Sequence, residues 1–292
     1  MEQKFLIIGK GSIGYRHFEL IKQYNTKSDV FHVSSREFLD NHNNILDKDF
    51  TFVVVAGPVI HRKSTLAKIS NKSSFILIEK PIFGSLINPE IIKNKNKIWV
   101  GYNLRFNPIV QMTKRFISTY SSPPIKATFV CESDARTWRS GDYLTRVSFN
   151  PNLGGGCLNE LSHEIDLMCF LFENCNYSIT ENKLKFEDHG LGKIDTCANF
   201  SLMVAPRLKC DFTLNIASKA NQRFFKIYFQ DGKYIKCDIM CSRITGCLEF
   251  KQEFSSNLPY VNQLRYCGSA NFQTNFRDAL KVVQIIEDLK DC

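Results

Sequence analysis

One short segment of the sequence places Glu160, His163 and Asp166 three residues apart. The apolar residues around them recur at helical spacing, and helical side chains three positions apart lie near one face. An imidazole titrates near neutral pH and accepts a hydroxyl proton, and a neighbouring carboxylate stabilises its cation. We therefore predict that His163 is a general acid/base supported by Glu160; the alternative is a histidine that only packs between helices. No second histidine or cysteine pair completes a zinc-like set with them, so we predict no metal site.

A lysine in the triplet Glu79-Lys80-Pro81 is the second candidate catalytic residue. Proline restricts the residue before it to extended conformations, so Lys80 is expected at the end of a strand rather than inside a helix. Its ammonium would there hydrogen-bond a substrate hydroxyl and stabilise the negative charge that develops on oxygen as hydride leaves carbon. The alternative is an ordinary surface lysine.

Three glycines, Gly9, Gly11 and Gly14, follow a short apolar run at G-x-G-x-x-G spacing. The first permits a tight turn, the second lets the backbone approach a pyrophosphate, and the third lets a helix pack close to the strand. The helix N-terminus, with Ser12 and Ile13 in its first turn, would meet the phosphates. The pattern predicts a dinucleotide site; the alternative is an ordinary glycine turn.

These candidates need elements that bring strand ends together. Apolar runs recur about every 25 residues in the first hundred, and the stretches between them can hold helices. The runs are 5–8, 30–33, 52–55, 75–78 and 98–100. Such alternation predicts a doubly wound parallel sheet in an α/β fold, with its ligand beyond the carboxyl ends of the strands. The further residues expected to contact the dinucleotide are Ala56, Gly57, Pro58, Glu79, Lys80 and Asn103.

The second of these runs ends in Ser34-Ser35-Arg36, about 20 residues past Gly14, where NAD-specific domains place an acidic residue for the ribose hydroxyl. No carboxylate stands at that point. A hydroxyl followed by a guanidinium suits a 2′-phosphate, so we predict NADP as the preferred cofactor, bound by Ser35 and Arg36, with NAD as the alternative.

After Pro108 the alternation ends, and strand-like segments follow with few helices between them. This pattern predicts a second α/β domain with a large, mostly antiparallel open sheet. We place the domains at 1–106 and 107–292. Candidate substrate contacts are Arg105, Trp138 and Arg139, because an indole offers a face to a sugar ring and arginines bind carboxylate or phosphate.

Several of these motifs together resemble the Gfo/Idh/MocA family of oxidoreductases. The resemblance rests on the glycine turn, Ala56-Gly57-Pro58 with His61, Glu79-Lys80-Pro81, the segment 101–108, and Gly154-Gly155-Gly156 followed by His163 and Asp166. It implies a Rossmann domain followed by a substrate domain whose sheet covers the nicotinamide. It also implies Lys80 and His163 as catalytic and substrate-binding residues, and His61 as a contact of the dinucleotide. It further implies a homodimer or homotetramer formed through the C-terminal sheet. Members of the family often carry Asp where this chain has Asn159 or Glu160, so this chain departs from the family pattern at the carboxylate that supports the histidine. We expect Asn159 to contact the substrate.

Composition narrows the class of protein. The chain has 292 residues, is 43% hydrophobic and carries a net charge of +9, with its basic residues dispersed rather than gathered in one run, so we predict no nucleic-acid partner. Its apolar stretches are too short to span a bilayer and no signal-peptide pattern opens it, so we expect a cytoplasmic protein without a membrane partner. The eleven cysteines are odd in number and lack a C-x-x-C pair, which favours reduced thiols.

The sequence therefore predicts an NAD(P)-dependent oxidoreductase that moves hydride between a nicotinamide and a carbinol or ketone carbon of a sugar or sugar derivative. Surface-polysaccharide or nucleotide-sugar metabolism is a fitting setting. One alternative is a reductase of the same fold acting on an imine or a linear pyrrole, for which His163 would be dispensable. The other is an NADP-binding protein without turnover.

Overall fold

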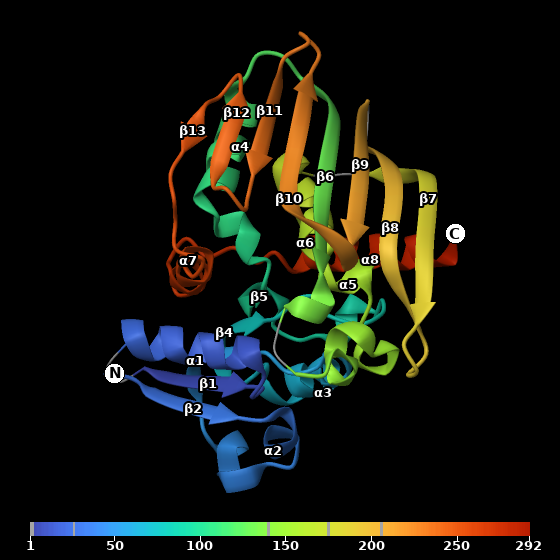
Figure 1. Ribbon diagram of the computed structural model, residues 1–292. Helices are drawn as coiled ribbons and strands as arrows, with labels where there is room; N and C mark the ends of the chain where they lie inside the picture. The colour runs from blue at the N-terminus through green and yellow to red at the C-terminus, as the bar shows by residue number, and fades with distance from the viewer. Residues whose placement is uncertain (1–2, 26, 139–140, 174–175, 205–206) are drawn as a thin grey trace. The chain divides into compact units, whose positions relative to one another are not determined.

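The computed structural model describes residues 3–25, 27–138, 141–173, 176–204 and 207–292 (Figure 1). The chain forms two compact units. The first comprises 1–102 and 260–284, and the second comprises 103–259 and 285–292. The chain thus passes between the units close to the predicted boundary near Phe106, but 260–284 return to the first unit. The domain ranges 1–106 and 107–292 stay a prediction, since compactness alone does not define an independently folding domain.

A five-stranded parallel sheet forms the centre of the first unit, in the order β2-β1-β3-β4-β5. Its strands are β1 (Lys4–Ile8), β2 (Asp29–Val33), β3 (Phe50–Val55), β4 (Ser73–Ile78) and β5 (Ile98–Val100). The register pairs Ile8 with Val33 and Val55, Val55 with Ile78, and Ile78 with Val100, so all five strands end level. This confirms the predicted sheet and places the segments that follow each strand along one edge.

Helices follow the first three strands of this sheet in the βα alternation that the sequence predicted, whereas 3₁₀ turns stand between β4 and β5 and a helix from late in the chain joins the unit. The helices are α1 (Ser12–Tyr24), α2 (Ser35–Leu39), α3 (Val59–Ile69) and α7 (Leu258–Cys267), with short 3₁₀ turns at His42–Asp47, Pro89–Ile91 and Lys95–Lys97. Helix α7 packs beside α1, where the rings of His17 and Tyr260 lie 5.8 Å apart. The buried face of α1 includes Leu20 and Ile21.

The edge strand β5 is closed by a side chain from far along the sequence. Asn275 accepts a hydrogen bond from the Val100 N–H at 2.7 Å and donates one to the Val100 carbonyl at 2.9 Å. The Thr274 hydroxyl donates to the Ile98 carbonyl. These side chains satisfy backbone groups that an edge strand otherwise leaves open to another chain.

An eight-stranded sheet forms the second unit, in the order β13-β12-β11-β10-β6-β9-β8-β7. All neighbours are antiparallel except β6 and β9. Its strands are β6 (Pro124–Asp134), β7 (Tyr177–Asp188), β8 (Lys193–Val204), β9 (Leu208–Asn215), β10 (Ala217–Phe229), β11 (Tyr234–Asp238), β12 (Arg243–Gly246) and β13 (Phe250–Lys251). The predicted open, mostly antiparallel sheet is therefore confirmed.

Helices α4 (Pro108–Thr119), α5 (Cys157–Glu160) and α6 (Ser162–Phe172) lie against one face of the large sheet (Figure 1). Helix α8 (Phe276–Asp291) belongs to the first unit up to Gln284 and to the second from Ile285. The remaining 3₁₀ turns are Asn103–Phe106, Ala135–Thr137, Tyr143–Thr145, Val147–Phe149 and Pro151–Leu153.

Two sequence expectations concern the chain as a whole. Within the described ranges, none of the helices combines the length and apolar character needed to cross a membrane. The cysteines in those ranges are all free and mostly buried.

Candidate functional site

The glycine turn opens the edge where the five parallel strands end. Gly9 has φ +127°, and a Cβ there would lie 2.6 Å from the Ala56 carbonyl carbon, so only glycine fits. A Cβ on Gly14 would collide with the Gly9 carbonyl oxygen. Gly11 differs, because nothing lies within 4 Å of the place that its Cβ would take. Packing within the protein thus explains two of the three glycines and leaves open space beside the third.

Gly11 is also the N-cap of α1, and no side chain caps the helix there. The first turn contains no acidic residue. The positive end of the helix dipole and the main-chain N–H groups of Ser12 and Ile13 therefore lie where an anion is favoured. This arrangement fits the pyrophosphate of a dinucleotide.

The segment after β2 contains a carboxylate that the sequence interpretation missed. Glu37 accepts a hydrogen bond from the Ser34 N–H at 2.5 Å, and the Ser34 hydroxyl caps the Glu37 N–H at 3.1 Å. The ammonium of Lys10, from the glycine turn, lies 2.9 Å from Glu37 Oε2. The hydrogen bonds from Ser34 and Lys10 lower the pKa of Glu37 to about 2. The signal for Glu37 was present as the capping-box spacing S-x-x-E.

The two predicted 2′-phosphate ligands differ in exposure. Ser35 is buried, and its hydroxyl occupies the space that a Cβ on Gly57 would need. The Arg36 side chain is 93% exposed, with its Nε 3.7 Å from Asp40 Oδ2. Of this pair, Arg36 is therefore the one whose charged group stands open to a ligand.

Lys80 lies two residues beyond β4, and its neighbours on both sides are held by one buried arginine. Arg62, on α3, donates hydrogen bonds to the Gly57 carbonyl at 3.2 Å, to the Glu79 carbonyl at 2.5 Å and to the Pro81 carbonyl. A cis peptide bond joins Lys80 to Pro81. Arg62 thereby fixes the main chain around Lys80 to the turn that follows β3.

The Glu79 side chain turns inward instead of facing a ligand. Its Oε1 lies 2.7 Å from His17 Nε2, and both residues are buried. A Cβ on Gly101 would lie 3.0 Å from Glu79 Oε2. Burial raises the pKa of Glu79, but the hydrogen bond and charge from His17 and the charges of Arg62 and Lys80 outweigh it, so the pKa lies below its ordinary value.

Two other residues predicted for the dinucleotide edge have different surroundings. His61 lies in the first turn of α3, behind the N-cap Pro58, and is half-buried. Asn103 is buried and belongs to the second unit by compactness.

In the second unit, the glycine triplet sets the start of α5. Gly156 has φ +115°, and a Cβ there would collide with the Asp195 carboxylate. Asp195 in turn accepts a hydrogen bond from the Leu158 N–H at 2.7 Å. Asn159 is buried and donates to the Gly154 carbonyl at 3.0 Å. The glycines therefore allow the chain to pack against a buried carboxylate that anchors the helix.

The single helix predicted for this segment is wrong. Leu161, with φ −101° and ψ 23°, ends α5, and a new helix begins at Ser162. Glu160 consequently lies on α5, whereas His163 and Asp166 lie on α6, so the three do not share one helical face. His163 and Glu160 are both half-buried.

Asp166 is paired with a residue that we predicted as a substrate contact. Arg105 donates to both carboxylate oxygens of Asp166, with Nη2 2.6 Å from Oδ1, and both side chains are buried. The guanidinium carbon of Arg105 also lies 5.2 Å from the centre of the Phe170 ring. This geometry gives Arg105 a structural role, and its contact with substrate stays a prediction.

The next predicted substrate contact, Trp138, directly follows the 3₁₀ turn Ala135–Thr137. Trp138 is 38% exposed, and its indole N–H donates to the Ser133 hydroxyl at 3.0 Å. Arg139 lies outside the described residues. No group of three histidine, cysteine or acidic side chains in the described part of the chain has the geometry of a metal site.

Known proteins support this architecture. No protein-family model matches the chain. Among curated proteins, it is 23% identical over 203 residues to an inositol 2-dehydrogenase/D-chiro-inositol 3-dehydrogenase from Lacticaseibacillus casei, a match that covers 60% of this chain and 54% of that protein. The chain thus matches about half the length of this curated relative.

Solved structures match over nearly the whole chain. A levoglucosan dehydrogenase in complex with NADH has a TM-score of 0.78 at 13% identity, with 100% of this chain and 96% of that one covered. The WlbA dehydrogenase from Bordetella pertussis, in complex with NADH and UDP-GlcNAcA, has a TM-score of 0.76 at 15% identity and the same coverage. The chain has the fold of the Gfo/Idh/MocA family. Within this Gfo/Idh/MocA-type fold, the predicted glycine turn and the segments 56–58 and 79–81 follow strands, and the glycine triplet precedes α5.

Proposed function

We propose that this chain is an NAD(P)-dependent oxidoreductase that transfers hydride between a nicotinamide and a carbinol or ketone carbon of a sugar or sugar derivative. The observation that carries the proposal is the uncapped N-terminus of α1 at Gly11, with open space beside it, at the edge where five parallel strands end level. Similar solved structures hold NADH, one of them with a nucleotide sugar, which supports the substrate class.

The residues proposed to hold the dinucleotide are those of the first unit's edge. The glycine turn and the N–H groups of Ser12 and Ile13 would bind the pyrophosphate, and the segments at Ala56, Glu79 and Lys80 would line the nicotinamide half. When bound, the nicotinamide supplies the hydride chemistry, either accepting or donating a hydride at its ring.

The chain's own residues handle the proton and the oxygen charge. In the oxidation direction, the imidazole of His163 takes the hydroxyl proton of the carbinol as its C–H bond breaks and the C=O bond forms. The ammonium of Lys80 stabilises the negative charge on that oxygen. The Glu160 carboxylate, on α5 and directly before the helix that carries His163, is proposed to stabilise the imidazolium.

We propose NADP as the preferred dinucleotide because the Arg36 guanidinium is open to a 2′-phosphate. Arg36→Ala should therefore raise the Kd of NADPH at least tenfold and leave that of NADH nearly unchanged. The Glu37 carboxylate is the observation that favours NAD, since it can accept a bond from a ribose hydroxyl. Equal effects of Arg36→Ala on the Kd of both cofactors would remove the preference for NADP.

The test of the function is a panel of sugars and nucleotide sugars followed at nicotinamide absorbance with NADH and NADPH, together with direct titration of both by fluorescence. We expect turnover with at least one sugar class and its loss in His163→Ala. Undiminished activity in His163→Ala would favour an imine or pyrrole reductase. Dinucleotide binding without turnover on any member of the panel would favour a binding protein, and absence of binding would refute the proposal.

The assembly is a separate proposal. We propose a homodimer or homotetramer formed through the outer face of the large sheet, where Lys126 pairs with Asp211 and the Lys226 ammonium lies over the Tyr234 ring. Light scattering coupled to size-exclusion chromatography tests it, and a monomer at micromolar concentration would refute it.

A further inference from the structure

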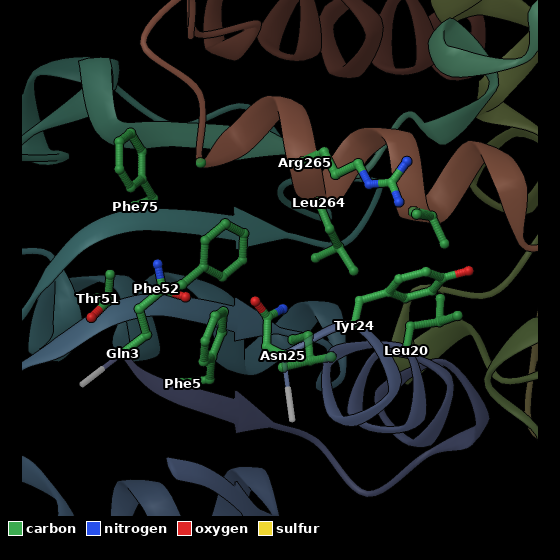
Figure 2. Close-up of a pocket in the computed structure, with 13 residues that line it drawn as sticks. Gln3, Phe5, Leu20, Tyr24, Asn25, Thr51, Phe52, Phe75, Leu264 and Arg265 are labelled. Atoms are coloured by element: carbon green, nitrogen blue, oxygen red, sulfur yellow. The ribbon is translucent and has the colours of Figure 1, made fainter. Parts of the chain in front are cut away.

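The first unit contains a cavity that the proposed function does not use. It measures about 210 Å³ and lies between the amino-terminal halves of β1 and β3 and the helices α1 and α7 (Figure 2). Phe5 and Phe52 line it from the sheet, and Leu20 and Leu264 line it from the two helices. Because the strands are parallel, this end of the sheet is opposite the edge with the glycine turn. The cavity is therefore distinct from the dinucleotide site.

The inner part of the cavity is apolar and aromatic. The rings of Phe5 and Phe52 are buried and lie 5.9 Å apart, centre to centre, at an angle of 36°. Leu20 and Val261 are buried beside them. An apolar cavity of about 150 Å³ lined by aliphatic and aromatic side chains binds benzene, so this larger one has room for one ring with a short side chain.

The outer part of the cavity carries the positive charge of Arg265. Arg265 is exposed, and among the described residues that line the cavity it alone carries a charge. Its guanidinium carbon lies 5.4 Å from the centre of the Tyr24 ring, and Figure 2 shows both side chains on the same side of the cavity. No carboxylate pairs with Arg265 in the ranges that the structure describes. An arginine with no acidic partner at an apolar opening is complementary to an anionic group on an apolar body.

We propose that this cavity is a second ligand site, which binds a small aromatic carboxylate. The ring packs against Phe5 and Phe52, and the carboxylate accepts hydrogen bonds from Arg265 at the opening. The site is independent of the proposed function, since its residues lie at the other end of β1 and β3 from Gly9 and Ala56. A ligand there would be an effector and not a competitor of the dinucleotide.

The test uses the full chain labelled with ¹³C at the methyl groups of Ile, Leu and Val, titrated with 3-phenylpropionate and with its neutral counterpart 3-phenylpropanamide. The acid should shift the methyl signals of Leu20, Ile21, Val261 and Leu264 in a saturable way. The amide should bind at least tenfold more weakly, because it lacks the charge that Arg265 recognises.

Two variants and a matched control identify the site. Arg265→Gln should weaken binding of the acid at least tenfold and leave the amide unchanged. Gly268→Phe should abolish both, because Gly268 is exposed at the rim and its Cβ would have no atom nearer than 3.9 Å, so the fold tolerates the ring. Arg16→Gln is the control, since Arg16 also lies over a tyrosine between α1 and α7, Tyr260 at 5.0 Å, but does not line the cavity.

Three results would overturn the proposal. They are the absence of saturable shifts at these four methyl positions with the acid, equal binding of acid and amide to the unmodified chain, and equal effects of Arg265→Gln and Arg16→Gln on the acid. None of these outcomes depends on turnover, so each is distinguishable from a failure of the proposed oxidoreductase activity.

Discussion

The replacement of Arg62 by methionine tests how the chain positions Lys80. Methionine keeps most of the apolar stem and removes every donor, which leaves the carbonyls of Gly57, Glu79 and Pro81 without their partner. A hydrogen bond from a charged donor contributes about 1.5 kcal/mol at the lower end of its range, so three amount to roughly 4 kcal/mol. Global stabilities lie at about 5–15 kcal/mol, so the variant should still fold but unfold at clearly lower urea concentration.

The effect on activity should exceed the effect on cofactor binding. A displacement of a catalytic group by about 1 Å costs on the order of a hundredfold in rate. Since Arg62 holds the residues on both sides of Lys80, we expect kcat to fall roughly tenfold to a hundredfold at a temperature where the variant is folded. The Kd of the dinucleotide should change less than kcat, because the proposed pyrophosphate site at the start of α1 is a different segment from the one that Arg62 holds.

The assay combines urea denaturation followed by circular dichroism, steady-state kinetics and fluorescence titration with NADPH. Lys63→Met is the matched control, since Lys63 is the next residue on α3 and is exposed. Arg62→Lys should recover part of the loss, because it restores one charged donor. An Arg62→Met variant with the stability of the Lys63→Met control, or with unchanged kcat when folded, would refute the reasoning.

Four further predictions concern the two units. Gly11→Ala should leave the free energy of unfolding within about 0.5 kcal/mol, because nothing lies near the added methyl group, yet it should weaken dinucleotide binding at least tenfold by fluorescence titration; unchanged binding would contradict the proposed pyrophosphate site. His163→Asn should lower kcat by about 10²–10⁴ with little change in dinucleotide Kd, as expected for a general acid/base, and a proportional loss of cofactor binding would point to a packing role instead. Arg105→Met should lower the free energy of unfolding measured in urea by about 3–5 kcal/mol, because it leaves the buried Asp166 carboxylate without its arginine. Adding Asp166→Leu should recover much of that loss, and no recovery would show that packing outweighs charge. Glu37 has a folded-state pKa of about 2 and an ordinary value of 4.5, so its contribution to stability is full above about pH 4.5 and is lost as the pH falls towards 2. Glu37→Gln should flatten the pH dependence of the free energy of unfolding between these values, and an unaltered profile would contradict the pairing of Glu37 with Ser34 and Lys10.

The sheet of the first unit could be predicted because four of its five strands are mostly buried and turn residues follow them. Runs such as 52–55 are continuous in apolar side chains, which is typical of parallel strands covered on both faces. The segments that follow the strands, including Gly9 and Glu79-Lys80-Pro81, then had to gather at one edge. The need for glycine at Gly9 and Gly14 was predictable from the strand-turn-helix motif, and the structure adds the close approach of Ala56 to Gly9.

Other features depended on contacts between distant residues. The break at Leu161 could not be read from the sequence, because leucine continues the apolar stripe and no glycine or proline marks the spot. Arg105 and Asp166 are 61 residues apart, and nothing in their spacing indicates that they pair. Strand β7 has no buried residue, so no apolar face marks the whole of it in the sequence.

The two hydrogen bonds between Asn275 and the Val100 backbone can form only late in the synthesis of the chain. A ribosome releases β1 to β5 early, but the side chain that satisfies the Val100 backbone leaves the exit tunnel only after the whole of the large sheet has been synthesised. Until then, the nascent parallel sheet has an open border that can recruit a strand from another polypeptide. We therefore expect fragments that end before residue 274 to bind chaperones or aggregate through the open edge of β5, and fragments that include residues 274–275 to do so less.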